Sequence, residues 1–212
     1  MEDFFTINKN TSAEITEKKS KFIANIFCVE NKEEAENIIK NTKKKYHDAR
    51  HNCVAYRVYE NDSIIEKSSD DGEPSGTAGA PMLEILKSNN LCNVLIVVTR
   101  YFGGILLGTG GLVRAYSECT KKAIENSEKV CKCKGYKIEI ELDYNNLENF
   151  KYYCSKKNIQ ITKIEYLDVI VCKIELEKKT KQNFLDDIET KKININKIRN
   201  SCEKIINKSV EK

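Results

Sequence analysis

The residues best suited to chemistry lie in two glycine-rich segments in the middle of the chain. Eight of the nine glycines and both prolines fall between Gly72 and Gly111. Glycine is needed where the backbone adopts a positive φ, or where another group must approach the main chain closely. This concentration predicts two shaped loops that contact a ligand or a partner.

The second glycine-rich segment follows an apolar stretch and leads into a predicted helix. Its glycines and its threonine are Gly103, Gly104, Gly108, Thr109, Gly110 and Gly111. With Thr109 as N-cap, the free N–H groups and the dipole of this helix would bind a phosphate or a carboxylate. Arg100 and Arg114 are candidate counter-charges, and Tyr101 is a candidate contact. The spacing fits neither a Walker A loop nor a dinucleotide fingerprint, and tight packing is the alternative role of these glycines.

The first glycine-rich segment is acidic and rich in hydroxyl groups. Its candidate contact residues are Asp70, Asp71, Gly72, Glu73, Pro74, Gly76, Thr77 and Gly79. The three carboxylates could hold Mg²⁺ or Ca²⁺, cap turns, or face basic residues of a partner. The alternating oxygen ligands of an EF-hand are absent, so we expect a structured recognition loop, with no metal and no cofactor.

The two histidines, His47 and His51, lie close together beside Arg50. A histidine near a carboxylate could act as a general base. Their spacing straddles the end of a helix and the start of a strand, so the two rings need not share a face. Since no motif for an acyl nucleophile occurs, we expect structural or partner-binding histidines and include Arg50 and His51 among the contact residues.

Cysteine content, charge and hydropathy narrow the class of protein. The nine cysteines include a single close pair, Cys131 and Cys133, whereas zinc sites usually use two such pairs, so free thiols are expected. The apolar run Val94 to Val98 is far shorter than the roughly 20 residues that span a bilayer. The first residues contain no apolar signal segment, so we expect a cytoplasmic protein without a membrane interaction. Residues 1–130 carry a net charge of −1 and residues 131–212 a net charge of +5.

The elements that must position these residues fall into two predicted domains, 1–130 and 131–212, of the α+β class. After a short N-terminal tail, the first has strands at 19–29, 51–59, 63–67 and 93–101, and helices at 32–46, 80–89 and 111–129. The strand at 93–101 is apolar throughout, which predicts a central position in its sheet. The second domain has the βαββαβ order of a ferredoxin-like fold. Its strands are expected at 134–142, 159–166, 169–177 and 196–205, and its helices at 147–157 and 181–192.

Three segments of the chain together resemble the YigZ/IMPACT family: His47 to Arg57, Ser69 to Leu83, and Val98 to Glu118. The resemblance implies that the first domain is an α/β sandwich like the second domain of a small-subunit ribosomal protein. It implies that the second domain is like the last domain of elongation factor G. It also implies a role like that of the eukaryotic relatives, which regulate translation initiation in the response to amino-acid starvation through a ribosome-associated partner.

Two functions follow, of which the first is favoured. One is a non-enzymatic, translation-associated regulator that binds the ribosome, RNA or a translation-factor-like protein through Arg50, Arg100, Tyr101 and Arg114. The other is a small-molecule enzyme that holds a phosphorylated ligand at the glycine-rich helix start. The enzyme is disfavoured because no catalytic residue can be assigned and no Mg²⁺ ligand set occurs beyond Asp70, Asp71 and Glu73.

Overall fold

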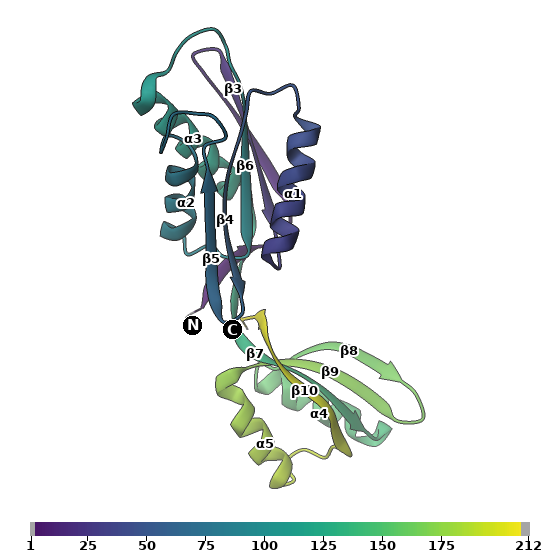
Figure 1. Ribbon diagram of the computed structural model, residues 1–212. Helices are drawn as coiled ribbons and strands as arrows, with labels where there is room; N and C mark the ends of the chain where they lie inside the picture. The colour runs from purple at the N-terminus through teal and green to yellow at the C-terminus, as the bar shows by residue number, and fades with distance from the viewer. Residues whose placement is uncertain (1–2, 209–212) are drawn as a thin grey trace. The chain divides into compact units, whose positions relative to one another are not determined.

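The computed structural model describes residues 3–208, which fold as two compact units (Figure 1). The first unit is Phe4–Val130, and the second comprises Asp3 and the described residues from Cys131 onward. Helices and strands occur in both, so each unit is of the α+β class. No helix within the described residues is long and apolar enough to cross a bilayer.

The first unit is built on a five-stranded sheet of order β2-β3-β6-β4-β5, in which every neighbouring pair is antiparallel. Its elements are β1 (Phe4–Ile7), β2 (Thr11–Glu17), β3 (Ser20–Cys28), α1 (Lys32–Lys45), β4 (His51–Glu60), β5 (Ser63–Ser69), α2 (Gly79–Ser88), β6 (Val94–Tyr101) and α3 (Gly108–Glu125).

Strand β6 lies at the centre of this sheet, as its continuous apolar sequence predicted. Ile96 and Val98 face the core formed with α2 and α3, and Leu95 and Val97 face the core formed with α1. Successive side chains of a strand point to opposite faces, so a strand covered by helices on both sides must be apolar at every position. Figure 1 shows α1 on one side of the sheet and α2 and α3 on the other.

Three predictions for the first unit were wrong: the N-terminal tail, the bounds of α3 and its N-cap. The expected N-terminal tail contains β1 and β2, and β2 forms an edge of the sheet. Helix α3 begins at Gly108, three residues before the predicted start, and ends at Glu125. Its N-cap position is Leu107, with no side-chain cap bond, so Thr109 lies in the first turn and is not the cap. Apolar periodicity ends at Ile124, and the chain enters the next strand at Lys129.

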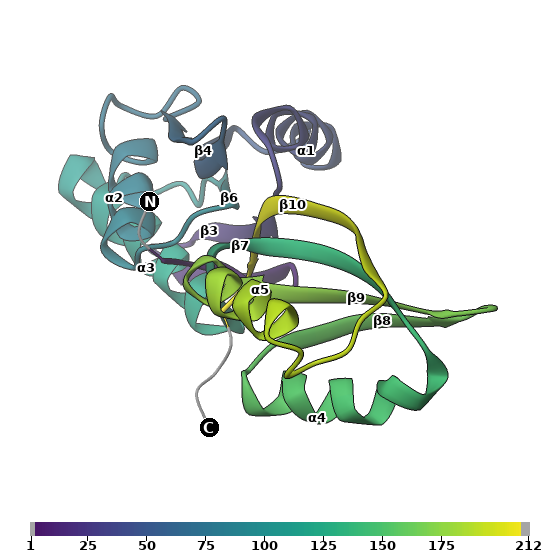
Figure 2. The same ribbon diagram turned by 90° about the horizontal axis from the view of Figure 1, so that it is seen from below.

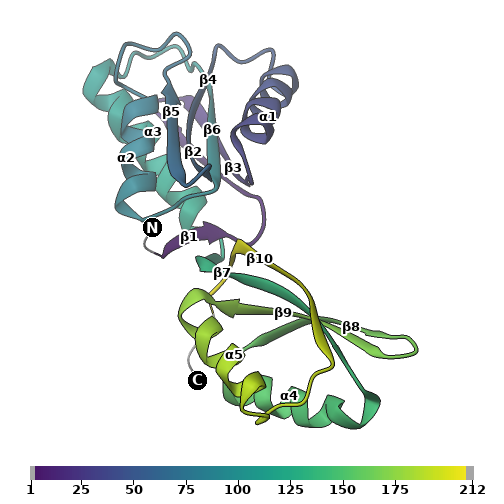
Figure 3. The same cartoon turned by 60° about the horizontal axis from the view of Figure 1, so that its bottom comes forward.

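The second unit has the predicted βαββαβ order. Its elements are β7 (Lys129–Leu142), α4 (Leu147–Lys156), β8 (Gln160–Tyr166), β9 (Ile170–Glu177), α5 (Lys181–Glu189) and β10 (Lys197–Asn207), with 3₁₀ turns at Tyr144–Asn146 and Lys178–Thr180. The strands pair antiparallel in the order β10-β7-β9-β8, the ferredoxin-like arrangement. Phe150 of α4 and Phe184 of α5 share one core with Ile140 and Cys172, so both helices cover the same face of the sheet (Figures 2 and 3).

Candidate functional site

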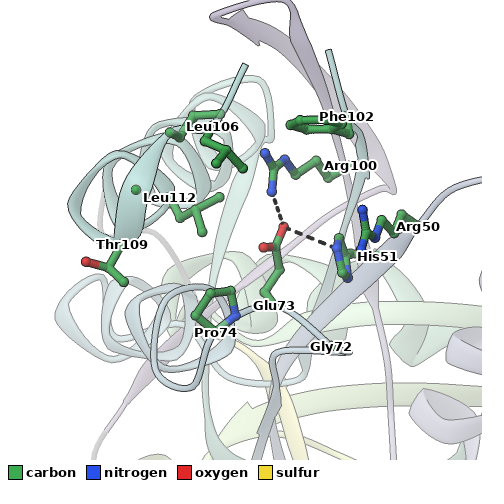
Figure 4. Close-up of a pocket in the computed structure, with 12 residues that line it drawn as sticks. Arg50, His51, Gly72, Glu73, Pro74, Arg100, Phe102, Leu106, Thr109 and Leu112 are labelled. Atoms are coloured by element: carbon green, nitrogen blue, oxygen red, sulfur yellow. Dashed lines mark hydrogen bonds and ion pairs between the residues drawn. The ribbon is translucent and has the colours of Figure 1, made fainter. Parts of the chain in front are cut away.

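A cavity of about 410 Å³ opens in the first unit, where β4 begins and β6 ends. The antiparallel pairing of His51 with Arg100 brings these two strand ends side by side. Strand β5 ends beside the start of β4, so the acidic segment that follows β5 meets the glycine-rich segment that follows β6 (Figure 4). The lining residues are Arg50, His51, Gly72, Glu73, Pro74, Arg100, Phe102, Leu106, Leu107, Gly108, Thr109 and Leu112. The volume is in the usual range for a ligand pocket.

Glu73 is the charged centre of the cavity, although its side chain is only 3% exposed. One carboxylate oxygen, Oε1, accepts a hydrogen bond from Arg100 Nη1 at 2.7 Å and another from the Tyr116 hydroxyl at 2.9 Å. Arg100 is itself buried, and its Nη2 donates to Ser20 Oγ at 3.4 Å. A buried ion pair keeps its charges only while each has partners, so these four side chains form one interdependent network.

Arg100 is not fully satisfied by this network. Its Nε is buried and has no hydrogen-bond partner among the described residues. The guanidinium lies between two aromatic rings, 5.5 Å from the centre of Phe22 and 5.6 Å from that of Phe102. Aromatic faces attract a cation, so the rings hold Arg100 in place where a hydrogen bond is missing.

His51 lines the cavity, and its two ring nitrogens have different surroundings. Its Nδ1 lies 2.9 Å from the backbone oxygen of Asp71, and because a carbonyl oxygen only accepts, Nδ1 carries the proton. The other nitrogen, Nε2, lies 3.9 Å from Glu73 Oε1, beyond hydrogen-bonding distance. His47 is exposed, contacts the backbone oxygen of Lys44, and does not line the cavity.

Tyr116 and the neighbouring Cys53, at the base of the network, are both held in their neutral forms. Burial raises the pKa of Tyr116 well above its usual value, and the neighbouring Cys53 and Glu73 raise it further. Burial also raises the pKa of Cys53 to about 12, against a weaker lowering effect of the Tyr116 hydroxyl. A thiol is nucleophilic only as the thiolate, so Cys53 is not an activated nucleophile.

The other carboxylates of the acidic segment make internal contacts. Asp70 accepts hydrogen bonds from the backbone N–H groups of Gly76, Ala78 and Gly79. Burial opposes ionisation of Asp70, but the three bonds outweigh it and lower the pKa. Asp71 pairs with Lys43 and accepts from the backbone of Asn52. Asp70 therefore shapes the loop and caps the start of α2, and Asp71 connects the loop to α1 and β4. Within residues 3–208, no three His, Cys, Asp or Glu side chains gather as a metal site.

The mouth of the cavity is apolar and exposed. Two large apolar residues that line it are exposed, Phe102 at 44% and Leu106 at 83%. Ile105, which does not line the cavity, is 43% exposed in the same segment. Arg50 is also exposed and lines the cavity. An exposed apolar cluster of this kind beside a concave surface is typical of an interaction site.

Comparison with known proteins places the chain in a family. A model described as the Impact N-terminal domain matches residues 18–124, which include the whole cavity, and a domain of unknown function (DUF1949) matches residues 140–190. The IMPACT family member YvyE of Bacillus subtilis is 37% identical over 184 residues, 87% of this chain and 84% of that protein. The chain belongs to the IMPACT family.

Two other similarities extend this result. The Protein IMPACT homolog of Dictyostelium discoideum is 45% identical over 101 residues, which cover 46% of this chain and 29% of that protein. The crystal structure of a hypothetical protein superimposes with a TM-score of 0.62 and 30% identity, covering 92% of this chain and 97% of the other.

In this IMPACT family chain, the structure brings eight of the sequence candidates together around the cavity. They are Arg50, His51, Gly72, Glu73, Pro74, Arg100, Gly108 and Thr109. Arg100 is engaged by Glu73, so it is a structural partner of the acidic loop and not a free counter-charge for a ligand anion.

The remaining candidates do not line the cavity. They are Asp70, Asp71, Gly76, Thr77, Gly79, Tyr101, Gly103, Gly104, Gly110, Gly111 and Arg114. Tyr101 donates its hydroxyl to Asp48 at 2.9 Å, and Arg114 is exposed on α3. Gly103 serves close packing, since a Cβ there would lie 2.0 Å from the backbone of Lys19. Gly110 is different, because an added Cβ would meet nothing closer than Arg114 Nη1 at 3.8 Å.

Sequence reasoning missed the apolar wall of the cavity and the base of its charged network. The wall is formed by Phe102, Leu106, Leu107 and Leu112, and the base by Ser20 and Tyr116. One signal in the sequence pointed to the wall: large apolar residues lie between the glycines of a loop. Such residues have no helix or strand face on which to be buried.

Proposed function

We propose that this chain is a non-enzymatic regulator of translation, acting in the cytoplasm, that binds a ribosome-associated protein partner through the cavity of its first unit. The observation that carries the proposal is the exposed apolar mouth formed by Phe102 and Leu106. Large exposed side chains around a pocket supply the buried contacts on which protein interfaces depend. The family resemblance to regulators of translation supplies the class of partner.

The charges of the cavity favour binding over catalysis. Glu73 and Arg100 neutralise each other, and Tyr116 and Cys53 are held neutral, so the network supports the shape of the loops. Arg50 is exposed at the cavity and would attract an acidic group of the partner. The expected ligand is therefore an apolar protein segment that carries a carboxylate beside the apolar residue.

The fold analogies belong to the same proposal. The first unit would correspond to the second domain of a small-subunit ribosomal protein, and the second unit to the last domain of elongation factor G. Both analogies come from the family resemblance, and both would suit a protein that works on the ribosome.

A phosphorylated small molecule is the second candidate. Gly108 and Thr109, at the start of the 18-residue helix α3, line the cavity together with Arg50. Free N–H groups at a helix start bind anions, so this corner of the cavity would suit a phosphate.

Sedimentation of the purified chain with ribosomes from its own cell lysate, which retain their associated proteins, tests the first candidate. We expect co-sedimentation, and we expect Leu106→Glu to weaken it roughly tenfold or more, because a buried contact at an interface centre is replaced by a charge. Leu167→Glu is the matched control, since Leu167 is 56% exposed in the second unit. Equal sedimentation of both variants with the wild type would refute the proposed surface. If Leu106→Glu does not change sedimentation with ribosomes, and phosphorylated metabolites displace the chain from them, the second candidate would be favoured.

A further inference from the structure

The second unit contains its own cavity, of about 340 Å³, between α4 and the segment that joins α5 to β10. Its lining residues are Asn146, Asn149, Phe150, Tyr152, Tyr153, Lys156, Lys192, Ile193 and Asn194. We infer that this cavity binds a nucleotide of a single-stranded nucleic acid. The inference is independent of the partner proposed for the first unit.

Tyr152 provides the stacking surface that such a site requires. Its side chain is 66% exposed on α4, while Phe150 and Cys154 on the same helix are buried in the core. Every base has a flat face that can stack on an aromatic ring, and only an unpaired base has that face available. This requirement selects a single strand over a duplex.

The charge of the cavity fits a phosphate backbone. Lys156 and Lys192 line it, and no carboxylate does so in the described part of the chain. Lys156 Nζ lies over the Tyr152 ring, 5.5 Å from its centre, so this cation is within reach of the phosphate of a nucleotide bound at that ring. Lys192 is bonded to Asp187 at 2.7 Å, but an ammonium group has three donors and this one is on a side chain that is 67% exposed.

Three amides supply the groups that read base edges. Asn146, Asn149 and Asn194 line the cavity, and within residues 3–208 their side chains make no hydrogen bond to the protein. An amide offers two donors and one acceptor oxygen, which is the pattern needed to pair with the edge of an unstacked base. Aromatic, cationic and amide side chains thus converge on one concave surface.

The opposite face of the same sheet does not offer these features. Lys137, Glu139 and Glu141 alternate along β7 with the core residues Ile138 and Ile140, so they lie on the face that the helices leave uncovered. Charges on this face pair with each other, as Lys137 with Glu175 at 2.7 Å and Arg199 with Glu141 at 2.7 Å show. A surface whose cations are already neutralised attracts a polyanion weakly. In the cavity Lys192 is also paired, with Asp187, but Lys156 makes no ion pair within residues 3–208 and is the available cation.

Fluorescence anisotropy of the purified full chain tests the inference without any ribosome. The probes are fluorescein-labelled oligouridine and oligodeoxythymidine of about 10 nucleotides, long enough to cover a site of this type. We expect saturable binding at low salt that weakens steeply between about 50 and 200 mM salt, because phosphate contacts release counterions. Tighter binding of oligouridine would mean that the site also recognises the 2′-hydroxyl. Equal affinity for the two probes would mean that it recognises only the base and the phosphate.

Variants of two exposed tyrosines make the test specific. We expect Tyr152→Ala to weaken binding roughly tenfold, and Tyr152→Phe to retain it, because stacking requires the ring and not the hydroxyl. Tyr166→Ala is the matched control, since Tyr166 is 61% exposed in the same unit. Lys156→Ala should reduce the slope of log affinity against log salt concentration by about 1, as expected for the loss of one phosphate contact. Absence of binding at low salt, or equal losses in Tyr152→Ala and Tyr166→Ala, would overturn the assignment.

Discussion

Each unit buries a carboxylate that is bonded to a tyrosine and to cations, but the two are built differently. Glu73 in the first unit meets Tyr116 and Arg100, and the Arg100 side chain is only 7% exposed. Asp187 in the second unit meets Tyr153, Lys157 and Lys192, and these lysine side chains are 46% and 67% exposed. The first is a closed ion pair in the wall of its cavity, and the second holds solvated lysines, of which Lys192 lines the other cavity.

The difference shows how burial of the cation determines the role of such a pair. When both ions are buried, removing one leaves the other without water or a partner, so the pair mainly fixes structure. When the cations stay in water, each keeps donors for a ligand and the loss of one is compensated by solvent. Glu73 is therefore expected to organise the loops of its cavity, whereas Asp187 positions Lys192, which lines the cavity of the second unit.

The largest expected effect comes from breaking the closed pair. Arg100→Met leaves Glu73 buried without its cation, and we expect the free energy of unfolding to fall by about 3–5 kcal/mol. Lys157→Met, which removes an exposed cation from Asp187, should cost less than about 1 kcal/mol. Urea denaturation of both variants measures the contrast. A similar loss in the two would mean that burial of the cation does not distinguish the sites.

A smaller effect is expected from the tyrosine hydroxyls. Tyr116→Phe removes a bond to a carboxylate in a fully buried network, and we expect a loss of about 1.5–3 kcal/mol in unfolding free energy. Tyr153→Phe should cost less, because Asp187 retains two lysines that are open to water. Thermal and urea unfolding of the two variants would sharpen the comparison, and a larger loss for Tyr153→Phe would reverse it.

The smallest effect is a pH dependence confined to the second unit. Bonds from Lys192 and Tyr153 lower the pKa of Asp187 from 3.8 to about 2, against the opposing effect of desolvation. Because the folded pKa lies below the unfolded one, this stabilisation is complete above pH 3.8 and is lost as the pH falls towards 2. The difference in stability between the wild type and Asp187→Asn should therefore shrink over that interval. A difference that stays constant from neutral pH to pH 2 would contradict the assigned cause.

Much of the architecture could be predicted from local patterns. Asn31 caps α1 by accepting from the backbone of Glu34, and the apolar run of β6 is central in its sheet. The βαββαβ order of the second unit also follows from its periodicity. The starts and ends of α3 could not be found in this way. Gly108 begins the helix with a φ of +71°, a conformation that the sequence pattern does not report.

The candidate site was predicted in outline and not in its contacts. The glycines are concentrated in the two segments that the structure brings together at the cavity. This concentration did not separate Gly103, where a side chain would collide with the backbone of Lys19, from Gly110, which has open space beside it. That distinction depends on which distant segment lies next to each glycine.

The sequence alone determined the family, the two-unit α+β organisation and the position of the glycine-rich segments. These depend on short-range patterns and on motifs that are continuous in the chain. Only the tertiary structure decided that Arg100 bonds to Glu73 and Tyr116 joins them, since these residues are 27 and 43 positions from Glu73. It also decided that Tyr152 and Lys192 line one cavity. Such contacts between distant residues depend on strand register and helix packing, which no local pattern specifies.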